Sequence, residues 1–280
     1  MKNLLLSGCL LGTILLSAQE LPQPSPLGAV QQRVGLTDIE IEYSRPQMKG
    51  RTIFGELVPF ERLWRTGANK ATRISFSTDV QVNGEPVSKG DYALLTIPGE
   101  NTWTVILNSE TEMWGTGSYS EDNNVLRTEV ATAASNQVVE TFSMDIRDIT
   151  GTSCGIGIEW EKTSVVIPVQ MDVARQAEMN IAKAIEEEQE NWRVFRNSAQ
   201  YYMNAGNMEE AIVLIDRCLE LDGSSWYSHW VRAQILHGLG EDEMAKEAAF
   251  SALELGEAGA KEKGTEFSYK GMIRSTMGGW

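Results

Sequence analysis

Residues 98–107 read PGENTWTVIL, a turn followed by a segment in which large apolar side chains occupy every second position. Pro98–Asn101 supply the turn, and Trp103, Val105 and Leu107 form the alternating set. A period of two places such residues on one face of a β-strand. The same pattern recurs at Ile39, Ile41 and Tyr43, at Ile74 and Phe76, and at Val80 and Val82. Short strands separated by regular turns predict an all-β sandwich or barrel-like domain.

The β pattern ends at residues 163–168, TSVVIP, which we expect to form the closing strand. Pro168 falls near its end, where a missing amide donor costs least. Because Trp103 stands in an alternating strand, we interpret Trp103 and Trp114 as core side chains rather than as platforms for sugar rings.

From about residue 172 the apolar period becomes helical, and the sequence resembles itself at an offset of 34 positions. The offset pairs Ala199 with Ala233, Gly206 with Gly240, Ala211 with Ala245 and Leu219 with Leu253. This offset is the tetratricopeptide period, in which small residues let two antiparallel helices approach closely. We therefore predict helices at about 192–204, 208–221, 226–238 and 242–255, a capping helix near 263–276, and a leading half-repeat helix near 172–189. The fold class is thus α+β with segregated domains.

The first residues have the composition of a secretory signal peptide. Lys2 precedes an apolar run from Leu4 to Leu16, which ends in small residues. We predict a signal peptide at 1–19 cleaved near Ala18 or Gln19, a β domain at 20–170 and helical repeats at 171–280. The alternative is lipid attachment at Cys9, but too few residues precede it for a complete leader. We expect a periplasmic or secreted protein without a membrane span.

Charge and cysteine usage exclude several kinds of site. The chain has a formal net charge of −15, which disfavours nucleic acid as a partner because phosphate binding needs an excess of cations. Cys154 and Cys218 fall among apolar residues, so we interpret them as small core residues and not as a disulfide. No metal site and no cofactor is implied.

Basic side chains are concentrated in one segment of the β half. Residues 43–72 hold Arg45, Lys49, Arg51, Arg62, Arg65 and Lys70 against Glu56 and Glu61. Interleaved aromatic residues and glycines predict a structured loop. We hypothesise that Arg45, Lys49, Arg51 and Arg65 converge on an anionic small molecule or glycan, with Asn69 supplying an amide and Trp64 a stacking face. The alternative is that the arginines pair with Glu56, Glu61 or carbonyl groups, and that Trp64 is simply core.

The same segment carries a family resemblance. Its motifs are Tyr43-Ser44-Arg45-Pro46, Lys49-Gly50-Arg51, Ile53-Phe54-Gly55, Leu57-Val58-Pro59 and Trp64-Arg65-Thr66-Gly67-Ala68-Asn69. Together with Gly90–Leu94 and Trp103–Ile106 downstream, they resemble the signature of the domain of unknown function 2911 family. The resemblance covers about residues 25–170 and implies an exported bacterial protein. It implies no activity.

The repeats predict a second site, for a protein or peptide partner. In the usual repeat geometry the first helix of each pair lines a concave face. This face would present Arg193, Arg196, Gln200 and Met203 from one repeat and Tyr227, Trp230, Gln234 and His237 from the next. The alternative is that the face packs on the β domain.

Catalytic motifs are sparse. Both histidines, His229 and His237, lie in the helical half, so the β half lacks the commonest general base. We therefore expect a binding or scaffolding protein rather than an enzyme. The alternative is an envelope enzyme that acts on a glycan or peptide through carboxylates and the basic loop. A third reading is a purely structural role in a larger assembly.

Overall fold

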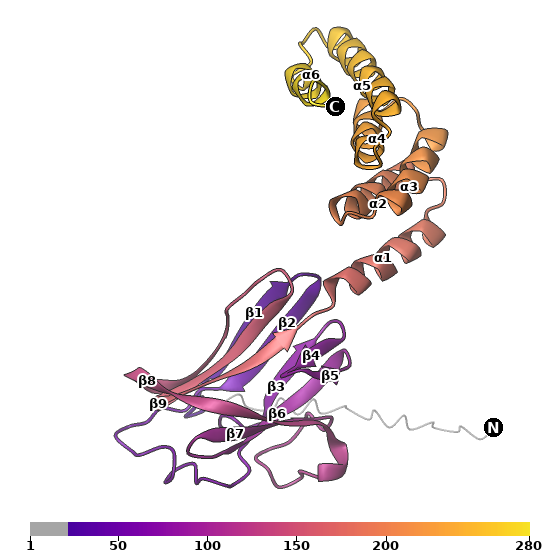
Figure 1. Cartoon of the computed structure of the whole chain (residues 1–280). Coiled ribbons are helices and arrows are strands. Elements are labelled where there is room, and N and C mark those ends of the chain that lie inside the picture. The colour runs from indigo at the N-terminus through magenta and orange to yellow at the C-terminus, as the bar shows by residue number, and fades with distance from the viewer. Residues whose placement is uncertain (1–21) are drawn as a thin grey trace, which may run out of the picture. The chain divides into compact units, whose positions relative to one another are not determined.

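The computed structural model describes residues 22–280, apart from the side chain of Asn136. It divides into two compact units, one ending at Val173 and one spanning Ala174–Trp280 (Figure 1). The expected signal peptide, its cleavage point near Ala18 or Gln19 and the alternative lipid acceptor Cys9 all lie outside the described residues.

The first unit is built from antiparallel strands. They are β1 (Leu27–Val34), β2 (Thr37–Ser44), β3 (Thr72–Phe76), β4 (Val80–Val82), β5 (Glu85–Val87), β6 (Gly90–Pro98), β7 (Thr102–Asn108), β8 (Asn124–Arg147) and β9 (Ser153–Gln170). Neighbouring strands follow the order β1-β2-β3-β6-β7-β8-β9-β4-β5. The predicted closing strand at 163–168 lies in the second half of β9, which is longer because the alternation of apolar residues begins already at Cys154.

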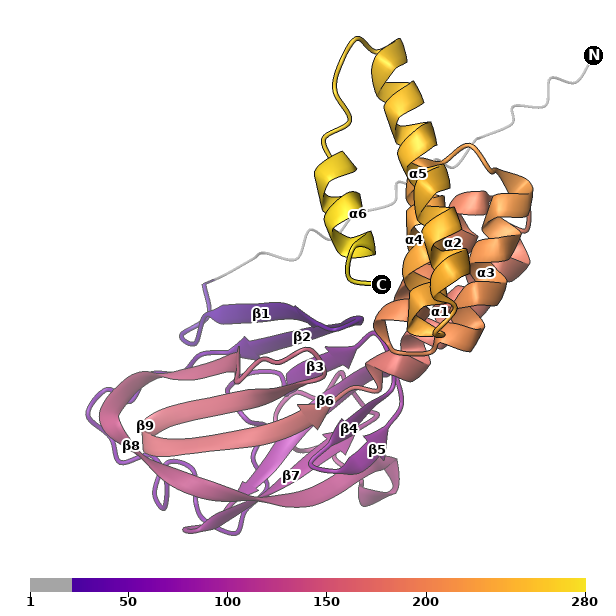
Figure 2. The ribbon, with the colours of Figure 1, turned by 45° about the horizontal axis from the view of Figure 1, so that its top comes forward.

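The two longest strands, β8 and β9, form a hairpin that stands between β7 and β4 in this strand order. β8 pairs with β7 before Thr132 and with β9 from Thr132 onward, and the end of β9 pairs with β4. Register shifts between Ala134 and Ser143 mark where the hairpin bends. Figure 2 shows β8 and β9 running side by side as a long curved ribbon.

The inner faces of these strands meet in one hydrophobic core. Trp103 and Trp160 are each 1% exposed within it, which confirms the core prediction for Trp103. The Tyr43 hydroxyl donates a hydrogen bond to the carbonyl of Met144, and so ties β2 to β8 across 3.0 Å. The inner faces of the strands bury their apolar side chains in this one cluster. This gives the sandwich-like body that the alternation of apolar residues predicts.

The core prediction for Trp114 is wrong, because its side chain is 65% exposed. Its neighbour Met113 is fully buried, and the Met113 carbonyl accepts a hydrogen bond from the Ala71 amide at 2.9 Å. The backbone here is extended, so turning Met113 inward turns Trp114 outward. The sequence around Trp114 has no alternation that reveals this register.

The second unit is helical. Its helices are α1 (Val173–Glu187), α2 (Trp192–Asn204), α3 (Met208–Leu221), α4 (Trp226–Gly238), α5 (Asp242–Glu262) and α6 (Lys270–Met277). α2 packs on α3 and α4 packs on α5, and corresponding helices begin 34 residues apart, as in tetratricopeptide repeats. Ala199, Ala211, Ala233 and Ala245 are all fully buried where the paired helices approach. Gly206 and Gly240 adopt positive φ angles of 85° and 82° in the turns within the pairs.

The end of the array differs from the prediction. α5 continues to Glu262 rather than stopping near 255, and α6 begins only at Lys270. Gly256 does not end the helix. A Cβ atom there would lie 2.4 Å from the Phe267 ring, so this glycine makes room for a side chain that folds back on α5.

Cys154 and Cys218 are buried and unpaired, which confirms their interpretation as core residues. Burial raises the pKa of the Cys154 thiol to about 11. Between residues 22 and 280 we find no helix whose length and apolar character would let it cross a membrane.

Candidate functional site

The basic loop connects β2 to β3 and is structured, as predicted. Isolated bridges pair Gln47 with Thr141 and Trp64 with Thr96. Ile53 and Val58 are 0% and 5% exposed, so the loop inserts side chains into the core of the β unit. These anchors fix the backbone from which the basic side chains project.

Aromatic rings form one wall of a pocket beside this loop. Trp64 and Trp160 are stacked with ring centroids 6.1 Å apart and planes 18° apart. The Trp64 indole N–H donates to the carbonyl of Gly67 at 3.0 Å. Gly67 has a φ of 149°, and a Cβ atom there would lie 3.0 Å from the carbonyl oxygen of Ser44. Trp64 is therefore both a core residue, at 9% exposure, and part of the pocket lining.

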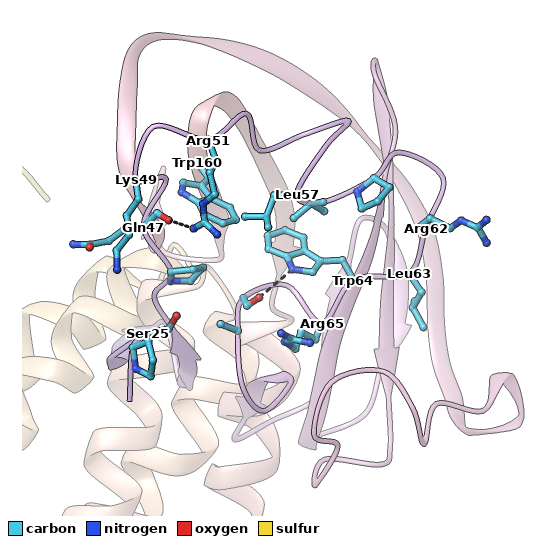
Figure 3. A pocket seen from close by; sticks show the side chains of 16 residues that line it. Ser25, Gln47, Lys49, Arg51, Leu57, Arg62, Leu63, Trp64, Arg65 and Trp160 are labelled. Atoms are coloured by element: carbon cyan, nitrogen blue, oxygen red, sulfur yellow. Dashed lines mark hydrogen bonds between the residues drawn. The ribbon is translucent and has the colours of Figure 1, made fainter. Parts of the chain in front are cut away.

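The pocket has a volume of about 470 Å³. Its cationic lining residues are Lys49, Arg51, Arg62 and Arg65, and its apolar ones include Leu57, Val58 and Leu63 (Figure 3). No aspartate or glutamate is among the described residues that line it. The described lining therefore gathers positive charge and no carboxylate, although the chain as a whole is acidic.

Arg65 is the half-buried cation of the pocket. Its Nε atom is buried and has no hydrogen-bond partner within the described chain. Burial lowers the pKa of its guanidinium, because the charged form has lost part of its hydration. A buried donor without an acceptor costs free energy, and an anion in the pocket would remove that cost.

The other three cations are more exposed. Arg51 donates from Nε to the carbonyl of Met48 at 2.8 Å and from Nη2 to that of Gln47 at 2.6 Å. In Figure 3 the Arg62 guanidinium points away from the other labelled cations. None of Lys49, Arg51, Arg62 and Arg65 forms an ion pair with a described acidic residue, Glu56 and Glu61 included.

Two of the hypothesised ligand-binding residues do not line the pocket. Arg45 donates from Nε to the carbonyl of Phe142 at 3.2 Å, and its stem packs over Gly28. The Asn69 amide donates to the carbonyl of Ser25 at 3.1 Å and to the Ser44 hydroxyl at 3.2 Å. Both side chains hold the loop in place instead of facing a ligand.

Sequence reasoning also missed lining residues. Trp160 lies on β9, far from the loop in sequence, and its alternation with Cys154 indicated only a core residue. Ser25 and Gln47 also line the pocket, and nothing in their local sequence marks them.

The predicted docking face of the repeats is largely occupied by its own side chains. Arg193 and Arg196 lie over the Trp192 ring, at 4.4 Å and 5.1 Å from its centroid. The Gln200 amide donates to the Tyr227 hydroxyl at 2.6 Å. These contacts engage the Trp192 ring, the Gln200 amide and the Tyr227 hydroxyl, whereas the Arg193 side chain remains exposed.

The second half of that face is covered by the end of the chain. Trp230 is 4% exposed, and Trp280 stacks on it with centroids 5.7 Å apart. Trp280 also stacks on His237, whose Nδ1 lies 2.7 Å from a carboxylate oxygen of Asp242. Met203 is partly buried in the helical core, and Gln234 is half-buried.

Comparison with known proteins identifies the β unit. A family model described as "Protein of unknown function (DUF2911)" matches residues 25–169, which is more than half of the chain. The protein belongs to the DUF2911 family. The DUF2911 region runs from before β1 to the end of β9 and contains every basic and aromatic residue of the pocket.

The other comparisons are less specific. No curated protein matches this DUF2911 chain. Among solved structures, the crystal structure of MamA matches with 19% identity and a TM-score of 0.28. The match covers 35% of this chain and 55% of that one, so the chain spans about half the length of MamA.

Proposed function

We propose that this DUF2911 protein is an exported binding and scaffolding protein. Its β unit binds an anionic ligand in the pocket lined by Lys49, Arg51 and Arg65, and its repeats dock a protein partner. A carboxylate, a sulfate or a phosphate group, carried by a small molecule or a glycan, suits the guanidinium donors. Trp64 and the more exposed Leu57, which both line the pocket, would contact the apolar part of such a ligand.

One observation carries the ligand proposal. The Arg65 Nε atom is buried at a pocket of about 470 Å³ and has no acceptor among the described residues. A structural arginine would satisfy this donor internally, as Arg45 does with the carbonyl of Phe142 and Arg51 does with that of Met48. The difference supports a ligand as the missing acceptor.

The alternative of an envelope enzyme receives no support from the pocket. Catalysis on a glycan by carboxylates needs two acidic side chains that flank the reacting bond. The described lining contains neither aspartate nor glutamate. Nearby Glu140 and Glu161 accept hydrogen bonds from backbone amides of the loop, of Lys49 and of Ile53 respectively, and so hold its backbone in place.

Thermal unfolding with sulfate, phosphate or glucuronate tests the ligand proposal. An anion at about 100 times its Kd stabilises the folded state by about 2.7 kcal/mol. We expect a concentration-dependent rise in the Tm of the wild-type protein that is lost in Arg65→Ala and reduced in Lys49→Ala.

The control is Arg127→Ala, which removes an exposed arginine on β8 outside the pocket. Sulfate and phosphate also stabilise proteins by exclusion from their surface. That general effect is equal in all variants, so an anion response in Arg65→Ala as large as that of the wild type and of Arg127→Ala would count against the site.

Export is tested separately. Mass spectrometry of the protein recovered from the periplasm or medium of an expressing bacterium should give a chain that starts close to residue 19 or 20. Recovery of the full-length chain from the cytosol alone would contradict export without affecting the pocket.

A further inference from the structure

An apolar groove of about 460 Å³ lies within the helical unit, on residues that the sequence did not mark as a site. Ile181 and Ile185 of α1 form one wall, and Val213 and Leu214 of α3 form the other. Tyr202 of α2 also lines it. Ile181 and Ile185 are four residues apart and so share one face of α1. Val213 and Leu214 are neighbours on α3, and both line the groove.

Positions 34 residues apart can be compared between repeats. The comparison shows that this groove is open to solvent, whereas the corresponding position in the following repeat is covered. Thirty-four residues after Ile181 stands Ile215, which is 0% exposed because α2 and α4 cover it. Ile181 is only half-buried, and α1 makes few contacts with the other helices. Val213 is 67% exposed, whereas a glutamate, Glu247, occupies the same position in the following repeat. An exposed apolar side chain at a position that tolerates charge points to a contact surface.

The rim of the groove is acidic. Glu178, Glu209 and Glu210 line it, and none forms an ion pair or a side-chain hydrogen bond with another described residue. The pKa of the Tyr202 hydroxyl is raised. Burial is the largest cause, and the negative charges of Glu178 and Glu210 add to it. The groove therefore combines apolar walls with negative potential that the helical unit does not neutralise.

We propose that this groove binds an amphipathic helical segment of a partner protein, with apolar side chains on one face and lysines or arginines beside them. The volume holds only a few large side chains, which suits the anchors of one helix face rather than a folded domain. The inference rests on the docking role proposed for the repeats, but it places docking between α1 and α3 and not on the face of α2 and α4.

Charge selects this occupant over two others. In a symmetric dimer a second copy would bring the same three glutamates to the interface, where like charges repel. An anionic membrane surface would be repelled in the same way. A basic amphipathic helix instead meets complementary charge on the rim and apolar contact in the groove.

The test measures binding of two labelled helical peptides to the full chain by fluorescence anisotropy. One is a 14-residue peptide of leucine and lysine with the leucines on one face, and the other has glutamate in place of lysine (length chosen as about four helical turns). We expect micromolar binding of the leucine–lysine peptide only. Val213→Glu, which copies the residue of the next repeat, should weaken it about tenfold or more, and Glu178→Gln with Glu210→Gln should weaken it several-fold and reduce its salt dependence.

The matched control is Phe250→Glu, which places the same charge on an apolar residue of α5 that is 60% exposed and outside the groove. Val213 and Phe250 are both exposed, so neither substitution should unfold the protein, and circular dichroism checks this. Equal binding by wild type and Val213→Glu would overturn the inference. So would a self-association, seen by light scattering, that Val213→Glu abolishes. Loss of the peptide in Tyr227→Ala but not in Val213→Glu would keep a docking role and overturn this groove.

Discussion

The basic loop and the predicted docking face of α2 and α4 both carry arginines and aromatic residues, the residue types that favour recognition. In the loop, Arg65 has a buried donor without a partner, beside a pocket that lacks acidic residues in its described lining. On the helical face, Trp230 is covered by Trp280, and the Tyr227 hydroxyl accepts from Gln200. Similar residue types are thus left unsatisfied in one region and satisfied in the other.

Composition alone therefore does not locate a binding site. Arginine and tryptophan are enriched at interfaces because they offer donors and large contact areas, but the same properties stabilise a protein internally. What distinguishes the pocket is that the unpartnered Arg65 Nε atom lies beside an open volume. Each prediction below tests one side of the comparison.

The largest effect is expected at Trp230. Because its side chain is 4% exposed and packs among α4, α5 and Trp280, Trp230→Ala should lower the free energy of unfolding of the helical unit by about 3–5 kcal/mol. Urea unfolding followed by circular dichroism at 222 nm measures this, since the helices dominate that signal.

Trp114→Ala is the matched control, because Trp114 is 65% exposed and should change stability by less than about 0.5 kcal/mol. A Trp230→Ala protein as stable as wild type would mean that Trp230 is not a core residue. The comparison between the two regions would then lose its helical half.

A smaller effect is expected at Gly256, which admits Phe267 against α5. A Cβ atom in Gly256→Ala would lie 2.4 Å from the Phe267 ring, which itself packs on Trp226 at 4.9 Å. Displacing the ring should destabilise the helical unit by about 1–2 kcal/mol, as overpacking does. Gly259→Ala in the same helix meets no atom within 4 Å and should instead stabilise by about 0.5–1 kcal/mol. Equal effects in the two variants would show that Phe267 does not pack closely on α5.

Much of the helical unit could be predicted, because the repeat supplies several agreeing signals. The bounds of α2, α3 and α4 follow from the offset of 34 residues and from the paired glycines Gly206 and Gly240, which lie in the turns. The end of α5 could not, since a glycine that ends a helix and a glycine that admits an aromatic ring are identical in sequence. Only the position of Phe267 separates the two.

The pocket could be predicted only in part. Clustered cations indicated Lys49, Arg51 and Arg65, and the family motifs drew attention to the loop. The sequence could not separate Arg65 from Arg45, because the carbonyl that satisfies Arg45 belongs to Phe142, 97 residues away. It also could not place Trp160, which β9 brings to the loop through the bent hairpin.

The smallest expected changes in the free energy of unfolding are for two arginines of the β unit, measured without added ligand. Arg147 bonds Asp145 and Glu159 at 2.7 Å and 2.9 Å, which raises its pKa, and its side chain is 28% exposed. Arg147→Ala leaves two carboxylates without their counter-charge and should cost about 1 kcal/mol, a value reduced by solvent screening. Arg65→Ala removes a guanidinium that has no internal partner for its Nε, so it should change the free energy of unfolding by less than about 0.5 kcal/mol. Urea unfolding followed by tryptophan fluorescence compares them. If Arg65→Ala proves the more destabilising of the two, then Arg65 is a structural residue, because a residue kept for a ligand contributes little until that ligand is bound.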